Sequence, residues 1–301
     1  MNSSERYVQP LSCTPLSRSA QSNEPPSRVI AVDWSGAGSG AARRIWLAEA
    51  SQPGRLVRLE AGRDRAALVE HLLGETSRTP DRLVIGLDFA FSFPAWFVRT
   101  VLGLDSAPAV WRQVSVQGEA WLCDCQPPFW GRPGRRRPPT TAIEPAFRRT
   151  ELALPSVGGI RPKSVFQIGG AGAVGTGSLR GLRLLDRLCQ AGARVWPFTP
   201  AGWPLVIEIY PRLLTGAVCK SDPRARAELL ERRYPALDAE HRAAGVASED
   251  AFDAAVSALV MLEHGAELAL SWLEPATDPD IRLEGRIWYP GWRGDTLSSE
   301  C

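Results

Sequence analysis

The apolar positions of this chain fall into short continuous runs that alternate with longer amphipathic stretches. Three runs, Arg28–Asp33, Leu83–Asp88 and Leu205–Glu208, are bounded by turn residues and have the length and composition of strands buried on both faces. Two further apolar segments, Arg44–Ala48 and Arg55–Leu59, follow the first run closely and predict, together with it, an antiparallel meander.

Helices are predicted where apolar residues recur at helical spacing, or where proline suits a first turn. The expected helices cover residues 65–73, a segment opened by Pro94, and residues 108–122, 178–190, 223–234 and about 248–272. Residues 282–289 are expected to close the domain as an edge strand. This order predicts an α/β fold with helices on both faces of a mixed sheet, whose first three strands are antiparallel and whose remaining strands are parallel.

The folded domain is expected to span residues 28–293, between a disordered polar tail at 1–27 and a short tail at 294–301. A segment at about 126–162 is rich in proline and arginine, and the prolines exclude regular structure over most of it. Loops of this length inside a domain are usually functional or mobile. We therefore treat this segment as an insertion in the domain.

Acidic residues stand at the ends of the three main strands and at the start of the last long helix. Asp33, Asp88 and Glu208 each end a strand, and Asp250 and Asp253 lie in the first turns of the helix. Parallel sheets place their binding crevice at the carboxyl ends of the strands, where neighbouring strands lie about 4.8 Å apart. Carboxylates this close repel one another unless a cation lies between them, and hard oxygen ligands favour Mg²⁺ or Mn²⁺. We therefore expect these five acids to form a site for Mg²⁺ or Mn²⁺, with a capping or turn role as the alternative for each.

Helical spacing distinguishes the two acids of the late helix. At about 100° per residue, Asp253 projects close to Val260, at the edge of the apolar stripe, so it should face the sheet. Asp250 lies on the same side, but acids in a first turn also complement the helix dipole, and Ser248 is a good N-cap. Asp253 is therefore the stronger candidate for the metal site.

Acids arranged in this way are suited to phosphodiester cleavage. Two divalent ions about 4 Å apart, held by carboxylates, activate a water and stabilise the leaving oxygen, and they require no histidine base. We accordingly expect Asp33, Asp88 and Asp253 to be catalytic. The three histidines of the chain are expected to be structural or exposed.

Several segments together resemble one known family. They are Asp33 within Ala-Val-Asp-Trp-Ser-Gly, Asp88 followed by Phe89 to Pro94, Lys163-Ser-Val-Phe-Gln167, Val174-Gly-Thr-Gly, Glu208-Ile-Tyr-Pro211, Asp250-Ala-Phe-Asp253-Ala and Glu284-Gly-Arg-Ile-Trp. In order and spacing, over about residues 28–290, they resemble the family called domain of unknown function 429, regarded as predicted nucleases of the ribonuclease H-like fold. The resemblance implies a central first strand with the Asp88 strand beside it. It also implies metal ligation by Asp33, Asp88 and Asp253, with Asp250 and Glu208 as weaker candidates. The acidic pair on the last helix resembles that of Holliday-junction resolvases as well.

A second set of residues is suited to contact a substrate. Its members are Trp130, Arg135, Arg136, Arg137, Lys163 and Gln167. The arginines could bind phosphates and the tryptophan could stack an unpaired base, although a solvated insertion is the alternative. The lysine and the glutamine precede a glycine-rich run at 169–177, which could present N–H groups to a phosphate or form a close-packed turn.

The overall composition adds little beyond exclusions. The net charge is +2 and the hydrophobic content is 44%, as in ordinary globular proteins. No apolar stretch approaches the roughly 18 residues needed to span a membrane, and no secretory signal opens the chain, so a cytoplasmic location is expected. The six cysteines are scattered without the spacing of zinc ligands.

The sequence therefore predicts a divalent-metal-dependent nuclease whose partner is its DNA or RNA substrate. One alternative is a nucleotide-dependent phosphotransferase or ATPase of the actin and sugar-kinase superfamily. There, Asp33-Trp-Ser-Gly and the glycine-rich run would hold nucleotide phosphates. The other alternative is a nucleic-acid-binding module that does not cleave.

Overall fold

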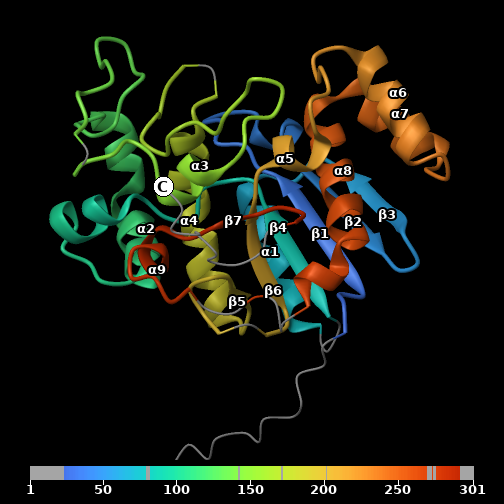
Figure 1. Ribbon diagram of the computed structural model, residues 1–301, viewed down its shortest axis with the longest axis horizontal. Coiled ribbons are helices and arrows are strands. Elements are labelled where there is room, and N and C mark those ends of the chain that lie inside the picture. Colours follow the sequence, from blue (N-terminus) through green and yellow to red (C-terminus); the bar gives the residue numbers. More distant parts are fainter. Residues whose placement is uncertain are drawn as a thin grey trace, which may run out of the picture.

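A mixed β-sheet forms the centre of the structure, which is a computed structural model (Figure 1). The structure describes residues 24–78, 82–141, 143–170, 172–200, 202–269, 273 and 276–291. The strands are β1 (Arg28–Asp33), β2 (Trp46–Ser51), β3 (Arg55–Glu60), β4 (Leu83–Leu87), β5 (Arg194–Val195), β6 (Leu205–Ile209) and β7 (Ile287–Trp288). Within the described ranges, these seven strands follow the order β3-β2-β1-β4-β6-β5, with β7 also paired to β6.

The first three strands are antiparallel and the later ones are parallel, as predicted. β1 pairs with β2, and β2 with β3, in antiparallel fashion. The pairs β1–β4, β4–β6, β5–β6 and β6–β7 are parallel. The register places Val32 opposite Leu87, and Leu87 opposite Glu208. The carboxyl ends of β1, β4 and β6 therefore reach the same edge of the sheet.

Helices cover both faces of this sheet. They are α1 (Arg65–Ser77), α2 (Ala107–Asp124), α3 (Arg149–Ala153), α4 (Val174–Gln190), α5 (Pro211–Thr215), α6 (Pro223–Arg233), α7 (Ala239–Ala247), α8 (Glu249–Glu263) and α9 (Ile281–Glu284). Side chains of α1, α2 and α4 share a hydrophobic core with one face of the sheet, and side chains of α5, α6 and α8 share a second core with the other face. Among the residues described, no helix has the length and apolarity that a bilayer crossing requires.

Strand alternation assigns each residue of β1 and β4 to one of the two faces. Val32 packs in the core with α4, whereas Ala31 packs in the core with α8. Gly86 of β4 lies on the α8 face, where a Cβ atom would stand only 2.7 Å from the sulfur of Met261. A residue without a side chain at this position therefore lets α8 approach the sheet closely.

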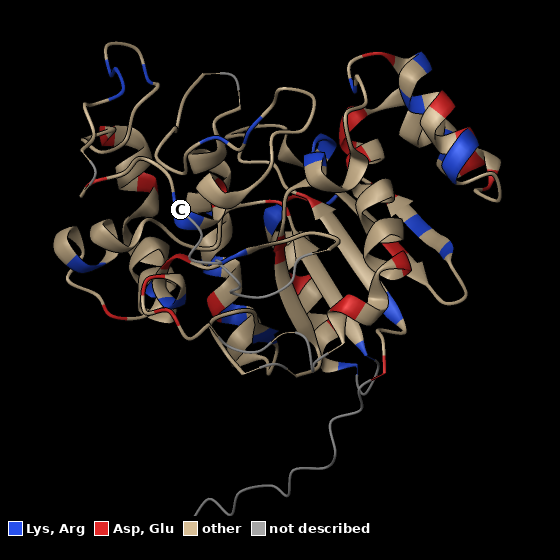
Figure 2. Ribbon diagram, in the orientation of Figure 1, with Lys and Arg blue, Asp and Glu red and all other residues tan. Residues whose placement is uncertain are grey.

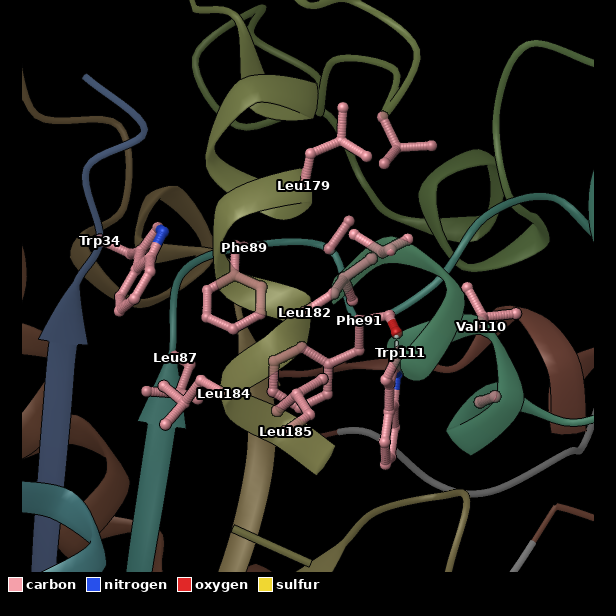
Figure 3. Close-up of a cluster of buried hydrophobic side chains, with 14 of the residues drawn as sticks. Trp34, Leu87, Phe89, Phe91, Val110, Trp111, Leu179, Leu182, Leu184 and Leu185 are labelled. Carbon is pink, nitrogen blue, oxygen red and sulfur yellow. Dashed lines mark hydrogen bonds between the residues drawn. The ribbon is translucent and has the colours of Figure 1, made fainter. Parts of the chain in front are cut away.

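Aromatic residues that follow β1 and β4 fix the loops at the carboxyl edge (Figure 3). Trp34 and Phe89 meet with ring centroids 5.2 Å apart. The indole N–H of Trp34 donates to the carbonyl of Gly177 at 3.0 Å. The indole N–H of Trp111 donates to the carbonyl of Phe91 at 2.8 Å. Both loops are thereby anchored to α2 and α4.

Several helices and strands begin or end at other residues than predicted. α4 begins at Val174, inside the glycine-rich run, and α8 ends at Glu263. The expected end near Trp272 lies outside the described residues. Within the segment expected as an edge strand, α9 precedes a strand that covers only Ile287–Trp288. α7 was not predicted because alanine supplies most of its apolar positions, which leaves a weak periodic pattern.

The expected tails fall largely outside the described residues, which begin at Glu24 and end at Gly291. The described part of the 126–162 insertion is mostly irregular, as predicted, but it contains the short helix α3. A helical segment follows Pro94, also as predicted, and it continues as a π-helical turn over Phe97–Val101.

Candidate active site

Asp33 and Asp88 leave the sheet side by side on the face that α8 covers. Each directly precedes an aromatic residue that packs on the α4 face, so alternation directs the two carboxylates to the opposite face. The N–H of Asp88 donates to the carbonyl of Val32 at 3.1 Å, which continues the pairing of β1 and β4 to their ends. The two acids are therefore neighbours, as the sequence predicted.

α8 carries Asp253 to the same place. Ser248 caps this helix, because its hydroxyl accepts a hydrogen bond from the N–H of Ala251 at 3.2 Å. Asp253 is only 7% exposed, which confirms the prediction that it faces the sheet. Asp250 is half-buried one turn earlier and lines a cleft beside the site.

These acids disfavour one another's ionisation. Burial raises the pKa of Asp33 well above its usual range, and the like charges of Asp88, Asp253 and Asp250 raise it further. Burial, with Asp253 as the main neighbouring acid, raises the pKa of Asp88 to about 8. The pKa values of Asp253 and Asp250 are also raised, chiefly by burial. A cation among these carboxylates would relieve both the burial and the repulsion.

Lys220, which sequence reasoning missed, supplies a positive charge to this cluster. Its ammonium group forms an ion pair with Oδ2 of Asp253, and its charge opposes the rise in the pKa of Asp33 and Asp88. The loop that carries it is held by Arg226, whose buried guanidinium donates to the carbonyl of Lys220. The sequence offered one indication of a special role for Lys220: lysine is rare in this chain, where only two of the 35 Lys and Arg residues are lysines.

The carboxylate oxygens of the cluster are the kind of ligand that a divalent cation prefers, but they are not yet arranged around a single ion. Among the described residues, no three Asp, Glu, His or Cys side chains are already arranged as ligands of a single ion. Oδ2 of Asp253 contacts Lys220, whereas Oδ1 is buried without a hydrogen-bond partner. A buried acceptor with no donor is costly. A hard cation would satisfy this oxygen, so the residues present fit Mg²⁺ or Mn²⁺.

Glu208 does not join the cluster. Leu205 and Ile207 of β6 face α8, so alternation places Glu208 on the α4 face. Arg148 donates two hydrogen bonds to its carboxylate, at 2.9 and 2.5 Å, and the N–H of Phe91 donates a third at 2.9 Å. The carboxylate of Glu208 is thus paired with the buried Arg148. This corrects the expectation that Glu208 ligates a metal.

An open cleft of about 820 Å³ lies beside the acids. Figure 2 shows acidic and basic segments of the ribbon close together at the carboxyl ends of the strands. The lining of the cleft includes the acids Asp33 and Asp250 and the arginines Arg44, Arg132 and Arg180. Arg180 binds an acid of α2. Within the described part of the chain, the guanidinium groups of Arg44 and Arg132 make no hydrogen bond or ion pair. The cleft therefore offers an anion two uncommitted guanidinium groups close to a cluster of carboxylates.

One wall of the cleft is the loop that follows β1. Gly36 packs so closely on α4 that a Cβ atom there would lie 2.4 Å from the backbone nitrogen of Gly177. Arg180 donates to the carbonyl of Gly36 at 2.5 Å, and Arg65 donates to the carbonyl of Ser35 at 3.0 Å. The loop is therefore held rigidly between α1 and α4.

The glycine-rich run also lines the cleft, and its first helical N–H groups are used within the protein. The N–H groups of Val174–Thr176 each donate to a nearby carbonyl, which favours the close-packed-turn alternative. Gln167 belongs to this turn, because its side-chain amide donates to the carbonyl of Gly169 at 3.3 Å. Lys163 is exposed and lies against Gly172, which lines the cleft. Of the two predicted phosphate contacts, Lys163 is therefore the better placed.

The aromatic and basic residues of the insertion do not form one surface. Arg135 and Arg136 are exposed, in keeping with their predicted contact to a phosphate backbone. Trp130 is only 9% exposed, and the guanidinium of Arg137 lies over the rings of Trp130 and Phe147 at 5.4 and 5.5 Å. The expectation that Trp130 stacks on an unpaired base is therefore wrong, because its ring is buried. Arg137 is likewise occupied by these rings.

Comparison of the chain with protein-family models, with curated proteins and with solved structures gave no match.

Proposed function

We propose that this chain is a divalent-metal-dependent nuclease that hydrolyses phosphodiester bonds in DNA or RNA. The observation that carries the proposal is the convergence of Asp33, Asp88 and Asp253, from β1, β4 and α8, on one face of the sheet. A cleft with two uncommitted arginines adjoins them. Carboxylates that hold metal beside guanidinium groups that hold phosphate are the parts that phosphodiester hydrolysis requires.

The sheet supports a ribonuclease H-like assignment of the fold. β1 is central, its antiparallel partners β2 and β3 lie on one side, and β4 lies parallel on the other. This is the arrangement that the resemblance to the domain of unknown function 429 family implies. Membership of that family, a nucleic-acid partner and a cytoplasmic location form part of the same proposal.

The residues of the site have distinct roles in this reaction. Mg²⁺ or Mn²⁺, when bound by Asp33, Asp88 and Asp253, would supply an activated water and neutralise charge on the phosphate. Arg44 and Arg132 would hold the anionic backbone in the cleft through charge-assisted hydrogen bonds. The rigid loop after β1 keeps the cleft wall in place as the substrate enters.

A panel of fluorescent single-stranded, duplex and branched DNA and RNA oligonucleotides tests this proposal, with Mg²⁺, Mn²⁺ or EDTA. The wild-type protein should cleave at least one substrate only when a divalent ion is present. Asp33→Asn, Asp88→Asn and Asp253→Asn should each reduce cleavage by about a hundredfold or more, while binding persists. Glu249→Gln, which changes an exposed acid on the same helix, is the matched control and should cleave normally. Binding without any metal-dependent cleavage would instead identify a nucleic-acid-binding module.

The phosphotransferase alternative has one observation in its favour. A cleft of about 820 Å³ is within the size range of pockets that enclose a nucleotide-sized ligand. The engaged N–H groups of Val174–Thr176 weaken it, because they are not free to bind phosphates. Mg²⁺-ATP at about 100 times its Kd would raise the free energy of unfolding by about 2.7 kcal/mol. A melting temperature raised by ATP, together with no cleavage of any oligonucleotide, would replace the nuclease by this alternative.

A further inference from the structure

Lys220 is built into the acid cluster. Its side chain is 16% exposed, the side chain of its partner Asp253 is 10% exposed, and the two form an ion pair. The positive charge of Lys220 also acts on Asp33, Asp88 and Asp250, where it opposes the rise of each pKa. The positive charge of this one ammonium group therefore acts on all four acids.

The fold holds this ammonium group in place through the loop between α5 and α6. Arg226, which is 3% exposed, donates to the carbonyls of Lys220 and Val246 and so joins the loop to the end of α7. Arg212 donates to the carbonyl of Val218 at 2.7 Å. Two arginines thus fix the backbone that presents Lys220 to the acids.

The identity of the residue adds an independent argument. Only two of the 35 Lys and Arg residues of the chain are lysines: Lys220 contacts Asp253, and Lys163 lies against Gly172, a residue that lines the adjoining cleft. A guanidinium is a planar fork, whereas an ammonium is a compact point charge. A chain that uses arginine almost everywhere else has lysine where a compact charge must fit among carboxylates, which is the place of a metal ion.

The positive charge of Lys220 favours a single divalent ion in the cluster. Four acids converge here, and Lys220 already offsets part of their negative charge. One divalent cation would offset more of it. A second would place two like-charged ions beside an ammonium group, which Coulomb repulsion opposes.

We propose that Lys220 takes the place of a second metal ion, so that this site binds one divalent cation and uses the ammonium group as its other positive charge. The unpartnered Oδ1 of Asp253 is available to the cation while Oδ2 stays with Lys220. During hydrolysis, a bond forms from the water oxygen to phosphorus and the bond to the leaving oxygen breaks. The proton lost by the water ends on that oxygen, whose developing charge Lys220 stabilises. The inference rests on the proposed nuclease function and specifies how its site is charged.

Titration of the EDTA-treated, dialysed full chain with Mn²⁺ tests this assignment, by calorimetry and by electron paramagnetic resonance of the free ion. Wild-type protein should bind about one Mn²⁺ per chain. Lys220→Met should bind a second ion or bind the first about tenfold more tightly, because a repelling charge has been removed. Lys220→Arg retains the charge and should still bind one. Lys163→Met removes the only other lysine and should leave the stoichiometry unchanged.

Two wild-type Mn²⁺ ions per chain, or a folded Lys220→Met protein with unchanged stoichiometry and affinity, would overturn the assignment. The number of Mn²⁺ ions bound by the wild type tests the assignment even where the Lys220→Met variant fails to fold. The oligonucleotide panel, run on the same samples, separates this inference from the nuclease proposal. Mn²⁺ binding as expected without cleavage would refute the nuclease and the part of Lys220 in hydrolysis, and would leave only its place as the second positive charge of the site. Cleavage by a protein that binds two ions would refute only the role of Lys220, and failure to bind Mn²⁺ at all would refute both.

Discussion

Replacing Asp88 by asparagine should stabilise the metal-free protein at neutral pH. In the folded protein, burial and the charge of Asp253 raise the pKa of Asp88 from 3.8 to about 8. A carboxyl group with a raised pKa favours folding when it is protonated, so the contribution of Asp88 to stability is greatest below about pH 4 and falls as the pH rises to about 8. At about 1.4 kcal/mol per pKa unit, the loss by pH 7 is on the order of 4 kcal/mol. Partial exposure of the side chain screens this to about 2 kcal/mol.

Thermal unfolding followed by circular dichroism in EDTA, between pH 4 and pH 8, measures this effect. At neutral pH the melting temperature of Asp88→Asn should exceed that of the wild type by about 4 °C, and the difference should disappear near pH 4. Glu249→Gln is the control and should give no gain, because an exposed acid in a first turn interacts favourably with the helix dipole. A melting temperature for Asp88→Asn at or below the wild-type value at pH 7 would refute the reasoning, since the carboxylates would then not repel one another.

When Mn²⁺ is added, the wild type should have a higher melting temperature than Asp88→Asn. A ligand that binds only the folded state stabilises it in proportion to RT ln(1 + [L]/Kd). Wild-type protein should therefore gain stability with Mn²⁺, whereas Asp88→Asn should gain little. Equal gains in both proteins would place the metal elsewhere.

Three other changes probe separate parts of the structure. Arg148→Met removes the cation from two buried glutamates and should lower the free energy of unfolding by about 3–5 kcal/mol in urea denaturation; a smaller loss would show that these acids are solvated. The double variant Arg135→Ala/Arg136→Ala should weaken binding of a single-stranded oligonucleotide and reduce the slope of log K against log salt by about 1.4, measured by fluorescence anisotropy; an unchanged slope would exclude this loop from the interface. Gly86→Ala forces a methyl group against the methionine of α8, at 2.7 Å, and should cost about 1–3 kcal/mol of unfolding free energy. It should also weaken Mn²⁺ binding, because α8 carries Asp253, and wild-type affinity would argue against that dependence.

The sequence was sufficient to predict the parts of the site that depend on local periodicity. Asp33 and Asp88 were found because an acid at the end of an apolar run marks a strand end, and parallel pairing then brings the two ends together. Asp253 was found because its position on a helical stripe can be counted from its apolar neighbours. These predictions required no knowledge of distant contacts.

Glu208 could not be placed in the same way. All five residues of β6 are buried, so the run has no alternation from which its two faces can be assigned. The face is fixed by the register with β4, which pairs Glu208 with Leu87, and by the presence of Arg148 on that side. Both are tertiary contacts with segments far away in the chain.

The insertion illustrates a second limit of composition as a guide. Its prolines and arginines correctly predicted irregular structure, but they also suggested that Trp130 would be exposed. Burial of Trp130 depends on Phe166, whose ring centroid lies 6.4 Å away, and on the guanidinium of Arg137 above it. Irregular segments can be well packed, and periodicity cannot reveal such packing. Lys220 was missed for the same reason, since it lies in a loop without pattern.

The hydrogen bonds of Glu284 bear on the order in which the protein folds during synthesis. Its carboxylate accepts hydrogen bonds from the N–H of Ala95 at 2.8 Å and of Arg149 at 2.6 Å, while its carbonyl accepts from Arg148. Glu284 is translated 135 residues after Arg149, so the ribosome has already released the insertion before this clasp exists. Strands β1 to β6 and α8 can assemble as the chain emerges, whereas the hydrogen bonds from Ala95 and Arg149 must wait until α9 has been made.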